Sequence, residues 1–79
     1  MTVKILGTGC ANCKRLEANT RQAVTQLGVE AEIEKVEDIN DIVDYGVMRT
    51  PGLVVGERVV VSGRVPSVAE LVSMLADEQ

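Results

Sequence analysis

The chain has 79 residues, of which 46% are hydrophobic and 25% are charged, and these values predict one folded domain over residues 1–79. The formal net charge is −4 and the single aromatic residue is a tyrosine, so a nucleic-acid partner is not expected. No apolar run approaches the ~20 residues that cross a bilayer, and no signal peptide precedes the first strand pattern, so a membrane partner is not expected either.

The first half of the chain alternates between strand and helix patterns. A short apolar run predicts a buried strand over Thr2–Leu6, and helical spacing predicts a helix from about Ala11 to Leu27, ended by Gly28. Residues 29–34 alternate between apolar and acidic side chains, which is typical of a half-exposed strand. The buried stripe of the helix is expected to comprise Cys13, Leu16, Thr20, Ala23, Val24 and Leu27.

The second half contains a short helix, a hairpin and a last helix. Asp38 can cap a helix that runs to about Tyr45, and the side chains expected to face inward from it are Ile39, Ile42 and Val43. Two β-rich runs, Gly52–Val55 and Arg58–Ser62, flank a turn at Gly56-Glu57 and predict a hairpin. A capping-box pattern then begins the last helix, at Ser67 and Glu70.

The predicted order of elements is βαβαββα. The long helix between the first two strands allows them to be parallel with a right-handed crossover, and the hairpin adds an antiparallel pair. The sequence therefore predicts an α/β fold with a four-stranded mixed sheet that is flanked by helices on both faces.

Cys10 and Cys13 are the only cysteines in the chain, and they stand between the first strand and the first helix. The unpaired N–H groups of a first helical turn stabilise a thiolate, so the pair is predicted to be a reactive dithiol. Cys10, near the N-cap, is expected to be exposed and more acidic, and to act as the nucleophile. Cys13 belongs to the apolar stripe and is expected to resolve the mixed disulfide. Without a signal peptide or membrane span the expected compartment is a reducing cytoplasm, where a lone cysteine pair is expected to be catalytic, redox-sensing or metal-binding and not a structural staple.

The Cys-X-X-Cys spacing also allows other functions. With no histidine and no further cysteine, one chain cannot complete a Cys₄ or Cys₂His₂ zinc site. Two-coordinate Cu(I), or zinc shared by two chains, stays open, as in metal-chaperone domains of the heavy-metal-associated kind. Those domains run βαββαβ and end in a strand. A redox-sensing adaptor, whose disulfide state changes its binding to a partner, is a third alternative.

The segment from Gly9 to Cys13, the helix behind it, and Thr50-Pro51 before the hairpin resemble the thioredoxin superfamily over essentially the whole chain. The resemblance is to its small glutaredoxin-sized branch of redox-active disulfide proteins, and it implies a minimal thioredoxin (glutaredoxin-like) fold. It further implies that Pro51 is cis and faces the dithiol, whereas a trans proline starting an edge strand is the alternative. Thr50 would then pair with a substrate strand beside Cys10, and Gly9 would line the same substrate site.

The same resemblance implies a function. It indicates a thiol–disulfide oxidoreductase that reduces protein disulfides and takes part in electron transport. No bound cofactor is implied, because the electrons reside in the dithiol itself. A flavin and NADPH, if used, would belong to a separate reductase. The chain departs from the family at Thr8-Gly9, which replace a tryptophan of ordinary thioredoxins, and at residues 62–67, which replace the glutathione-holding stretch of glutaredoxins.

Overall fold

The computed structural model describes residues 1–78 of the protein. Within that range the order of elements is βαβαββα, as predicted, and no helix is long and apolar enough to cross a membrane. The elements are β1 (Thr2–Leu6), α1 (Ala11–Leu27), β2 (Glu32–Val36), α2 (Ile39–Asp44), β3 (Gly52–Val55), β4 (Arg58–Ser62) and α3 (Val68–Asp77).

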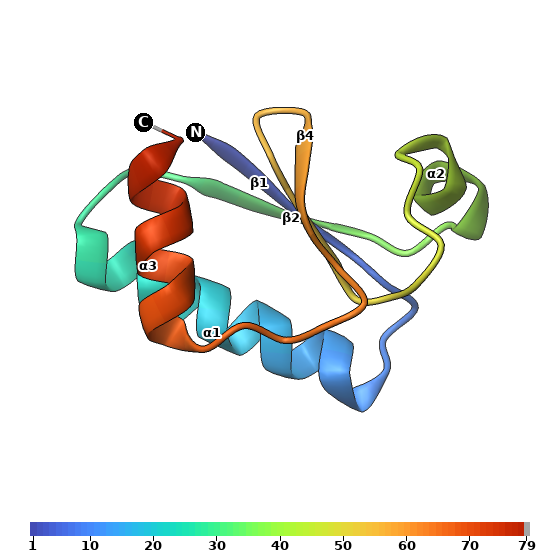
Figure 1. Ribbon diagram of the computed structural model, residues 1–79, viewed down its shortest axis with the longest axis horizontal. Helices are drawn as coiled ribbons and strands as arrows, with labels where there is room; N and C mark the ends of the chain where they lie inside the picture. The colour runs from blue at the N-terminus through green and yellow to red at the C-terminus, as the bar shows by residue number, and fades with distance from the viewer. Residues whose placement is uncertain (79) are drawn as a thin grey trace.

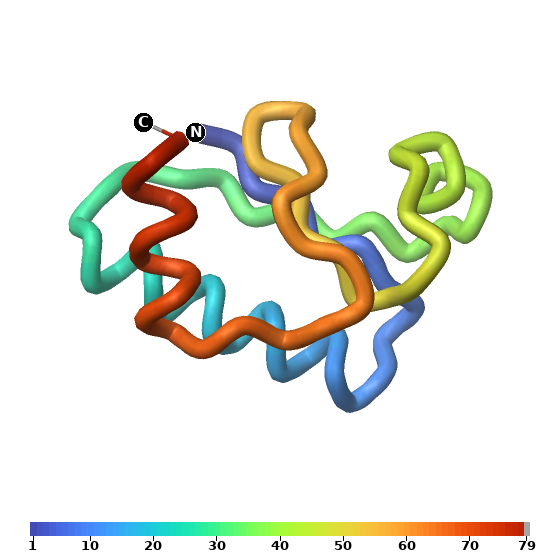
Figure 2. Tube along the Cα trace, viewed as in Figure 1, coloured from blue at the N-terminus to red at the C-terminus, as the bar shows by residue number. Residues whose placement is uncertain are grey.

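The strands form one mixed sheet in the order β2-β1-β3-β4. β1 is parallel to β2 and antiparallel to β3, and β3 pairs antiparallel with β4 across the turn at Gly56 and Glu57. Figure 2 traces residues 63–67 from the end of β4 (orange) to the start of α3 (red). The predicted sheet, including the parallel first pair and the hairpin, is confirmed.

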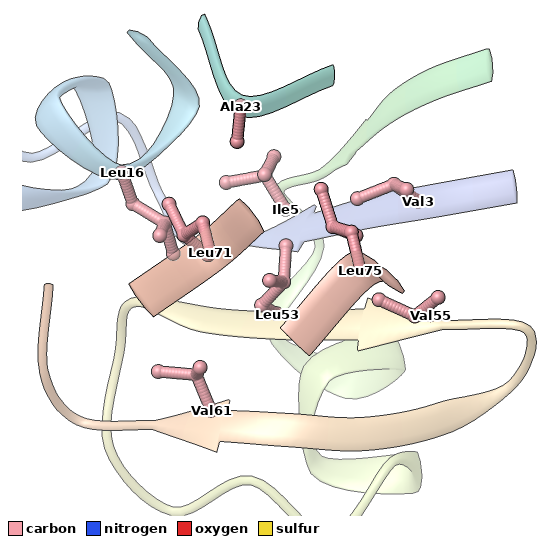
Figure 3. Close-up of a cluster of buried hydrophobic side chains, with 9 residues drawn as sticks. All are labelled: Val3, Ile5, Leu16, Ala23, Leu53, Val55, Val61, Leu71 and Leu75. Atoms are coloured by element: carbon pink, nitrogen blue, oxygen red, sulfur yellow. The ribbon is translucent and has the colours of Figure 1, made fainter. Parts of the chain in front are cut away.

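Helices cover both faces of this sheet, because its central strands alternate their side chains between two apolar clusters. α1 and α3 pack together on one face, whereas α2 lies apart from them (Figure 1). The larger cluster joins both long helices to the strands, as Figure 3 shows, and consists of Val3, Ile5, Leu16, Ala23, Leu53, Val55, Val61, Leu71 and Leu75. The smaller cluster, under α2, consists of Leu6, Ile42, Val47 and Val54.

α1 buries the stripe that its sequence predicts. Four of the six predicted residues are fully buried and the other two pack against the larger cluster. The hydroxyl of Thr20, the one buried polar side chain in the described core, donates a hydrogen bond of 2.7 Å to the Leu16 carbonyl. Its hydrogen-bonding capacity is therefore satisfied inside the helix. Gly28 follows with φ 68° and ends the helix.

The prediction for α2 was wrong at two of three positions. Ile42 is 2% exposed, but Ile39 is 64% exposed and Val43 is 55% exposed. The helix has six residues, so it makes fewer than two turns and presents only one side chain to the sheet. Val47, beyond the helix, joins Ile42 in the smaller cluster. The cap at Asp38 is confirmed, since its carboxylate accepts a hydrogen bond of 2.8 Å from the N–H of Asn40.

β2 begins later than the alternating pattern suggested. Its first residue is Glu32, which pairs with Thr2 at the beginning of β1. The three residues before it have no neighbouring strand, because β1 contributes only five residues to the pairing. The alternation itself holds, since Val29, Ala31 and Ile33 are half-buried and the glutamates between them are exposed.

The capping box of α3 provides a test of the fold. The Ser67 hydroxyl accepts a hydrogen bond of 3.2 Å from the Glu70 N–H, and the Glu70 carboxylate accepts one of 3.3 Å from the Ser67 N–H. Ser67→Ala should lower the free energy of unfolding by about 1 kcal/mol, measured by urea denaturation. The control is Ser73→Ala in the exposed middle of α3, where alanine favours the helix and stability should not fall. Equal urea denaturation midpoints for the two variants would contradict this role of the capping box.

Candidate active site

The cysteine pair lies where β1 passes into α1. Cys10 is the N-cap of α1, with extended backbone angles, and its sulfur accepts a hydrogen bond of 3.1 Å from the Cys13 N–H. The first turn of α1 contains no acidic residue. The positive end of the helix therefore faces the Cys10 sulfur without a competing carboxylate from its own turn. Such an environment stabilises the thiolate when the pair is reduced.

The two sulfurs differ in their access to solvent. Cys10 and Cys13 form a disulfide with a Cα–Cα distance of 5.0 Å, as the spacing of one helical turn allows. Cys10 is exposed, whereas Cys13 is 5% exposed and belongs to the buried stripe of α1. An incoming disulfide or thiol therefore meets the sulfur of Cys10 first.

Gly7, at the end of β1, lies directly against the buried sulfur. A Cβ atom at this position would overlap the Sγ of Cys13 and would lie 3.9 Å from the Cβ of Thr50. Gly7 thus touches the dithiol on one side and the loop before β3 on the other. The sequence analysis missed this residue, although a glycine that directly follows a buried strand before a Cys-X-X-Cys is a signal for such a close approach.

The loop before β3 brings Thr50 and Pro51 to the dithiol. Their peptide bond is cis, and the Pro51 carbonyl accepts a hydrogen bond of 2.8 Å from the Gly63 N–H. Pro51 is fully buried, whereas Thr50 is exposed beside Gly7. Gly9 is exposed next to Cys10 and has φ 88°, a value that favours glycine. The five residues singled out from the sequence therefore lie in one region of the molecule.

A cavity of about 150 Å³ lies between Cys13 and residues at and after the end of β2. Its lining consists of Ile5, Gly7, Gly9, Cys13, Lys14, Glu17, Lys35 and Glu37. Glu17 lies one helical turn after Cys13, and its two carboxylate oxygens pair with Arg21 at 2.9 Å and Lys35 at 3.0 Å. These hydrogen bonds, Arg21 first, hold the pKa of Glu17 below its ordinary value. A fixed, ionised carboxylate therefore shares a cavity with Cys13.

Lys4 takes no part in this cavity, although it is close to the cysteines in sequence. Its ammonium group lies on the other face of the sheet, 2.7 Å from the Tyr45 hydroxyl and 2.8 Å from the Glu57 carboxylate. The bond to Glu57, and then the one to Tyr45, raise the pKa of Lys4 above its ordinary value. Alternation along β1 separates Lys4 from Ile5, which faces α1.

The observed geometry can be compared with the metal-chaperone alternative. Among residues 1–78, no group of three or more His, Cys, Asp or Glu side chains is placed to hold a metal ion. The order of elements is not the βαββαβ of that class, because two helices precede the hairpin and the last described element is α3. The exposed and buried cysteines at the first helix of this βαβαββα fold are arranged as thiol–disulfide exchange requires, with one sulfur accessible and the second within bonding distance of it.

Comparisons with known proteins place the chain in a family. A family model for the thioredoxin domain matches residues 1–76. The chain is 43% identical over 76 residues to the thioredoxin of Methanothermobacter thermautotrophicus. The aligned region covers 96% of this chain and 99% of that protein. It is 41% identical over 71 residues to the thioredoxin of Methanocaldococcus jannaschii, and this aligned region covers 90% of this chain and 81% of that protein. The chain belongs to the thioredoxin family.

Membership of this family confirms the activity that the sequence predicted. The protein is a thiol–disulfide oxidoreductase whose redox centre is the pair Cys10–Cys13. Such exchange needs no bound cofactor, because the two electrons are held by the cysteine sulfurs. Thioredoxins in general act on disulfide-containing proteins and are returned to the dithiol state by a reductase. The metal-binding and adaptor alternatives are not favoured.

The contact at Gly7 predicts a sensitive position. Gly7→Ala should displace the Cys13 sulfur, and it should lower the free energy of unfolding of the oxidised protein by about 1–3 kcal/mol because the site is already filled. The rate at which this variant reduces a model disulfide should also fall. Thr8→Ala, at the exposed next residue, is the control and should change stability by less than about 0.5 kcal/mol. Unchanged stability and turnover in Gly7→Ala would show that the contact is not restrictive.

The ion pairs of Glu17 predict a pH-dependent contribution to stability. Because the folded-state pKa is lowered from 4.5, this contribution is complete above about pH 4.5 and disappears as the pH falls through the folded-state pKa. Glu17→Gln should therefore cost about 0.5–1 kcal/mol at pH 7 and progressively less below pH 4.5, as measured by urea denaturation at each pH. A difference between the two proteins that stays constant into acid would contradict the pairing.

Proposed function

We propose that Cys10 is the nucleophile and Cys13 the resolving cysteine in the reduction of protein disulfides. The Cys10 thiolate attacks one sulfur of the substrate disulfide, and the other sulfur leaves as a thiolate. Cys13 then loses its proton and attacks the Cys10 sulfur, so the second substrate sulfur leaves as a thiolate. Two electrons pass to the substrate, and the Cys10–Cys13 disulfide remains. The observation that carries this assignment is the exposed Cys10 sulfur at the N-cap, with Cys13 buried behind it.

The proposed binding site for the substrate strand comprises Gly9, Thr50 and Pro51. Within residues 1–78, the backbone N–H and C=O of Thr50 form no hydrogen bond to other backbone groups, so both can pair with an extended peptide. Pro51 is buried behind Thr50 and supports this loop from the inside. Gly9 contributes no side chain beside Cys10, which leaves room for the substrate backbone.

The cavity beside Cys13 offers a route for the proton that this residue loses. In the described chain the cavity beside Cys13 is lined by Gly7 and Gly9 and by residues of α1 and β2, and not by Cys10, Thr50 or Pro51. Glu17 is an ionised acceptor in its wall. We place the departing proton on water in this cavity, hydrogen-bonded to Glu17, from where it passes to solvent.

The proposed activity needs an electron donor and a compartment in which the dithiol stays reduced. Each turnover leaves a disulfide, so continued reduction of substrates needs electrons from a separate reductase, and one that uses a flavin and NADPH is the proposed partner. Electron transport of this kind operates in a reducing compartment, for which we propose the cytoplasm. Residues 1–79 are proposed to act as one domain of glutaredoxin-like size.

Substitution of the two cysteines tests the assigned roles. Cys10→Ser should reduce disulfide turnover to the level of the protein that lacks both cysteines, because the nucleophile is lost. Cys13→Ser should still attack and should accumulate a mixed disulfide with the substrate, because nothing resolves it. Mass spectrometry of the unreduced protein distinguishes the two outcomes. A mixed disulfide in Cys10→Ser, and none in Cys13→Ser, would reverse the roles.

A further inference from the structure

The basic residues of the chain fall into two groups. Five of the eight are ion-paired: Lys4 with Glu57, Arg21 and Lys35 with Glu17, Arg58 with Glu78, and Arg64 with Glu70. The other three form no ion pair within residues 1–78, and they are Lys14, Arg15 and Arg49. All three are exposed and close in sequence to the proposed active-site residues. The lysine and arginine side chains without an ion pair in the described chain are therefore all neighbours, along the sequence, of residues proposed for the active site.

Arg49 is held at the edge of the proposed substrate site. It directly precedes Thr50, and its stem lies over Gly63, where an added Cβ would be 3.0 Å from the Arg49 Cβ and 3.4 Å from its Cδ. Gly63 in turn donates its N–H to the Pro51 carbonyl. The absence of a side chain at Gly63 lets the arginine stem lie against this loop. The stem of Arg49, the residue directly before Thr50, is therefore supported by its packing over Gly63.

Two further unpaired cations and one acid are close to the cysteine motif. Lys14 and Arg15 follow Cys13 in the first turn of α1. Glu37 is the acid closest to the motif, 3.9 Å from the point where a Cβ of Gly9 would lie, and it shares the cavity with Lys14. Among the cations without an ion pair in the described chain, Arg49 is the one that directly precedes Thr50.

We propose that Arg49 is a specificity-determining residue that selects disulfides in an acidic sequence context. An Asp or Glu side chain, on the substrate strand that pairs with Thr50, forms an ion pair with the Arg49 guanidinium beside the reacting cysteine. This inference rests on the proposed function, since it names the substrate class of the same site. The net charge of −4 would otherwise disfavour the approach of acidic substrates, and the cations around Cys10 reverse that effect locally.

Two synthetic peptides test this proposal. They share one intramolecular disulfide and differ only at the residues flanking its cysteines, which are aspartates in one peptide and lysines in the other. The second-order rate constant for their reduction is measured with the reduced wild-type protein, with Arg49→Gln and with Arg49→Lys. Arg58→Gln is the matched control, because Arg58 is an exposed arginine paired with Glu78 at the hairpin end of β4.

The proposal predicts that the wild-type protein reduces the aspartate peptide faster than the lysine peptide at low ionic strength. Arg49→Gln should slow reduction of the aspartate peptide about three- to fivefold, while Arg49→Lys retains most of the rate and Arg58→Gln retains all of it. Salt at 0.5 M should remove most of the difference between the peptides.

Three results would overturn the inference. Equal rates for the two peptides with the wild-type protein would leave the proposed function intact and reject the substrate class. An equal loss of rate for both peptides in Arg49→Gln would show that Arg49 acts on Cys10 and not on the substrate. Failure of the wild-type protein to reduce either peptide would reject the proposed function itself, and the inference with it.

Discussion

The close contact between the Cys13 sulfur and Gly7 is the constraint on which the site depends. It joins the end of β1 to the first turn of α1 with no space for a Cβ between them. Because Cys13 is buried there, the helix has to begin at Cys10, whose sulfur then lies over the unpaired N–H groups of the first turn. Thr50 also lies beside Gly7, since its Cβ would be 3.9 Å from a Cβ at that position. The absence of a side chain at Gly7 therefore lets the buried sulfur lie against the end of β1, close to the loop before β3.

The loop before β3 owes its position to the smaller apolar cluster. Ile42 anchors the short helix α2 to the sheet, and Val47 continues the cluster toward Thr50. Gly52 lies close to Val47 and leaves little room between the loop and the start of β3. The face of the sheet away from α1 thus supports the active site from behind. This explains why a helix of only six residues is sufficient, since it has to hold one buried side chain and not a long interface.

The dithiol has two sides of different chemical character. On the side of β2, Glu17 and Lys35 form a fixed ion pair in a cavity that reaches the buried sulfur. On the side of Thr50, the backbone is open and Arg49 is the unpaired charge in the described chain. The first side is suited to the proton of Cys13, and the second side to the substrate. The separation lets both steps of an exchange reaction proceed at one pair of cysteines.

Patterns of local sequence were sufficient for the order of elements, the family and the two cysteines. The stripe from Cys13 to Leu27, the capping box at Ser67 and the hairpin turn all depend on residues within a few positions of each other, and each was predicted correctly. Packing at a distance decided the rest. The inward faces of α2 were misassigned at Ile39 and Val43, because the number of side chains a short helix buries depends on the surface beneath it.

The active site shows the same division between what local sequence determines and what packing between distant residues determines. The sequence by itself determined that Cys10 is exposed at a helix end and that Cys13 is buried, because both follow from helical periodicity and the N-cap position. Only the tertiary structure brought Gly7 against Cys13, Glu17 against Lys35, and Arg49 against Gly63. These contacts join different elements of the chain, in two cases more than ten residues apart. The folding of the sheet and helices, and not local propensity, decides which of these residues meet.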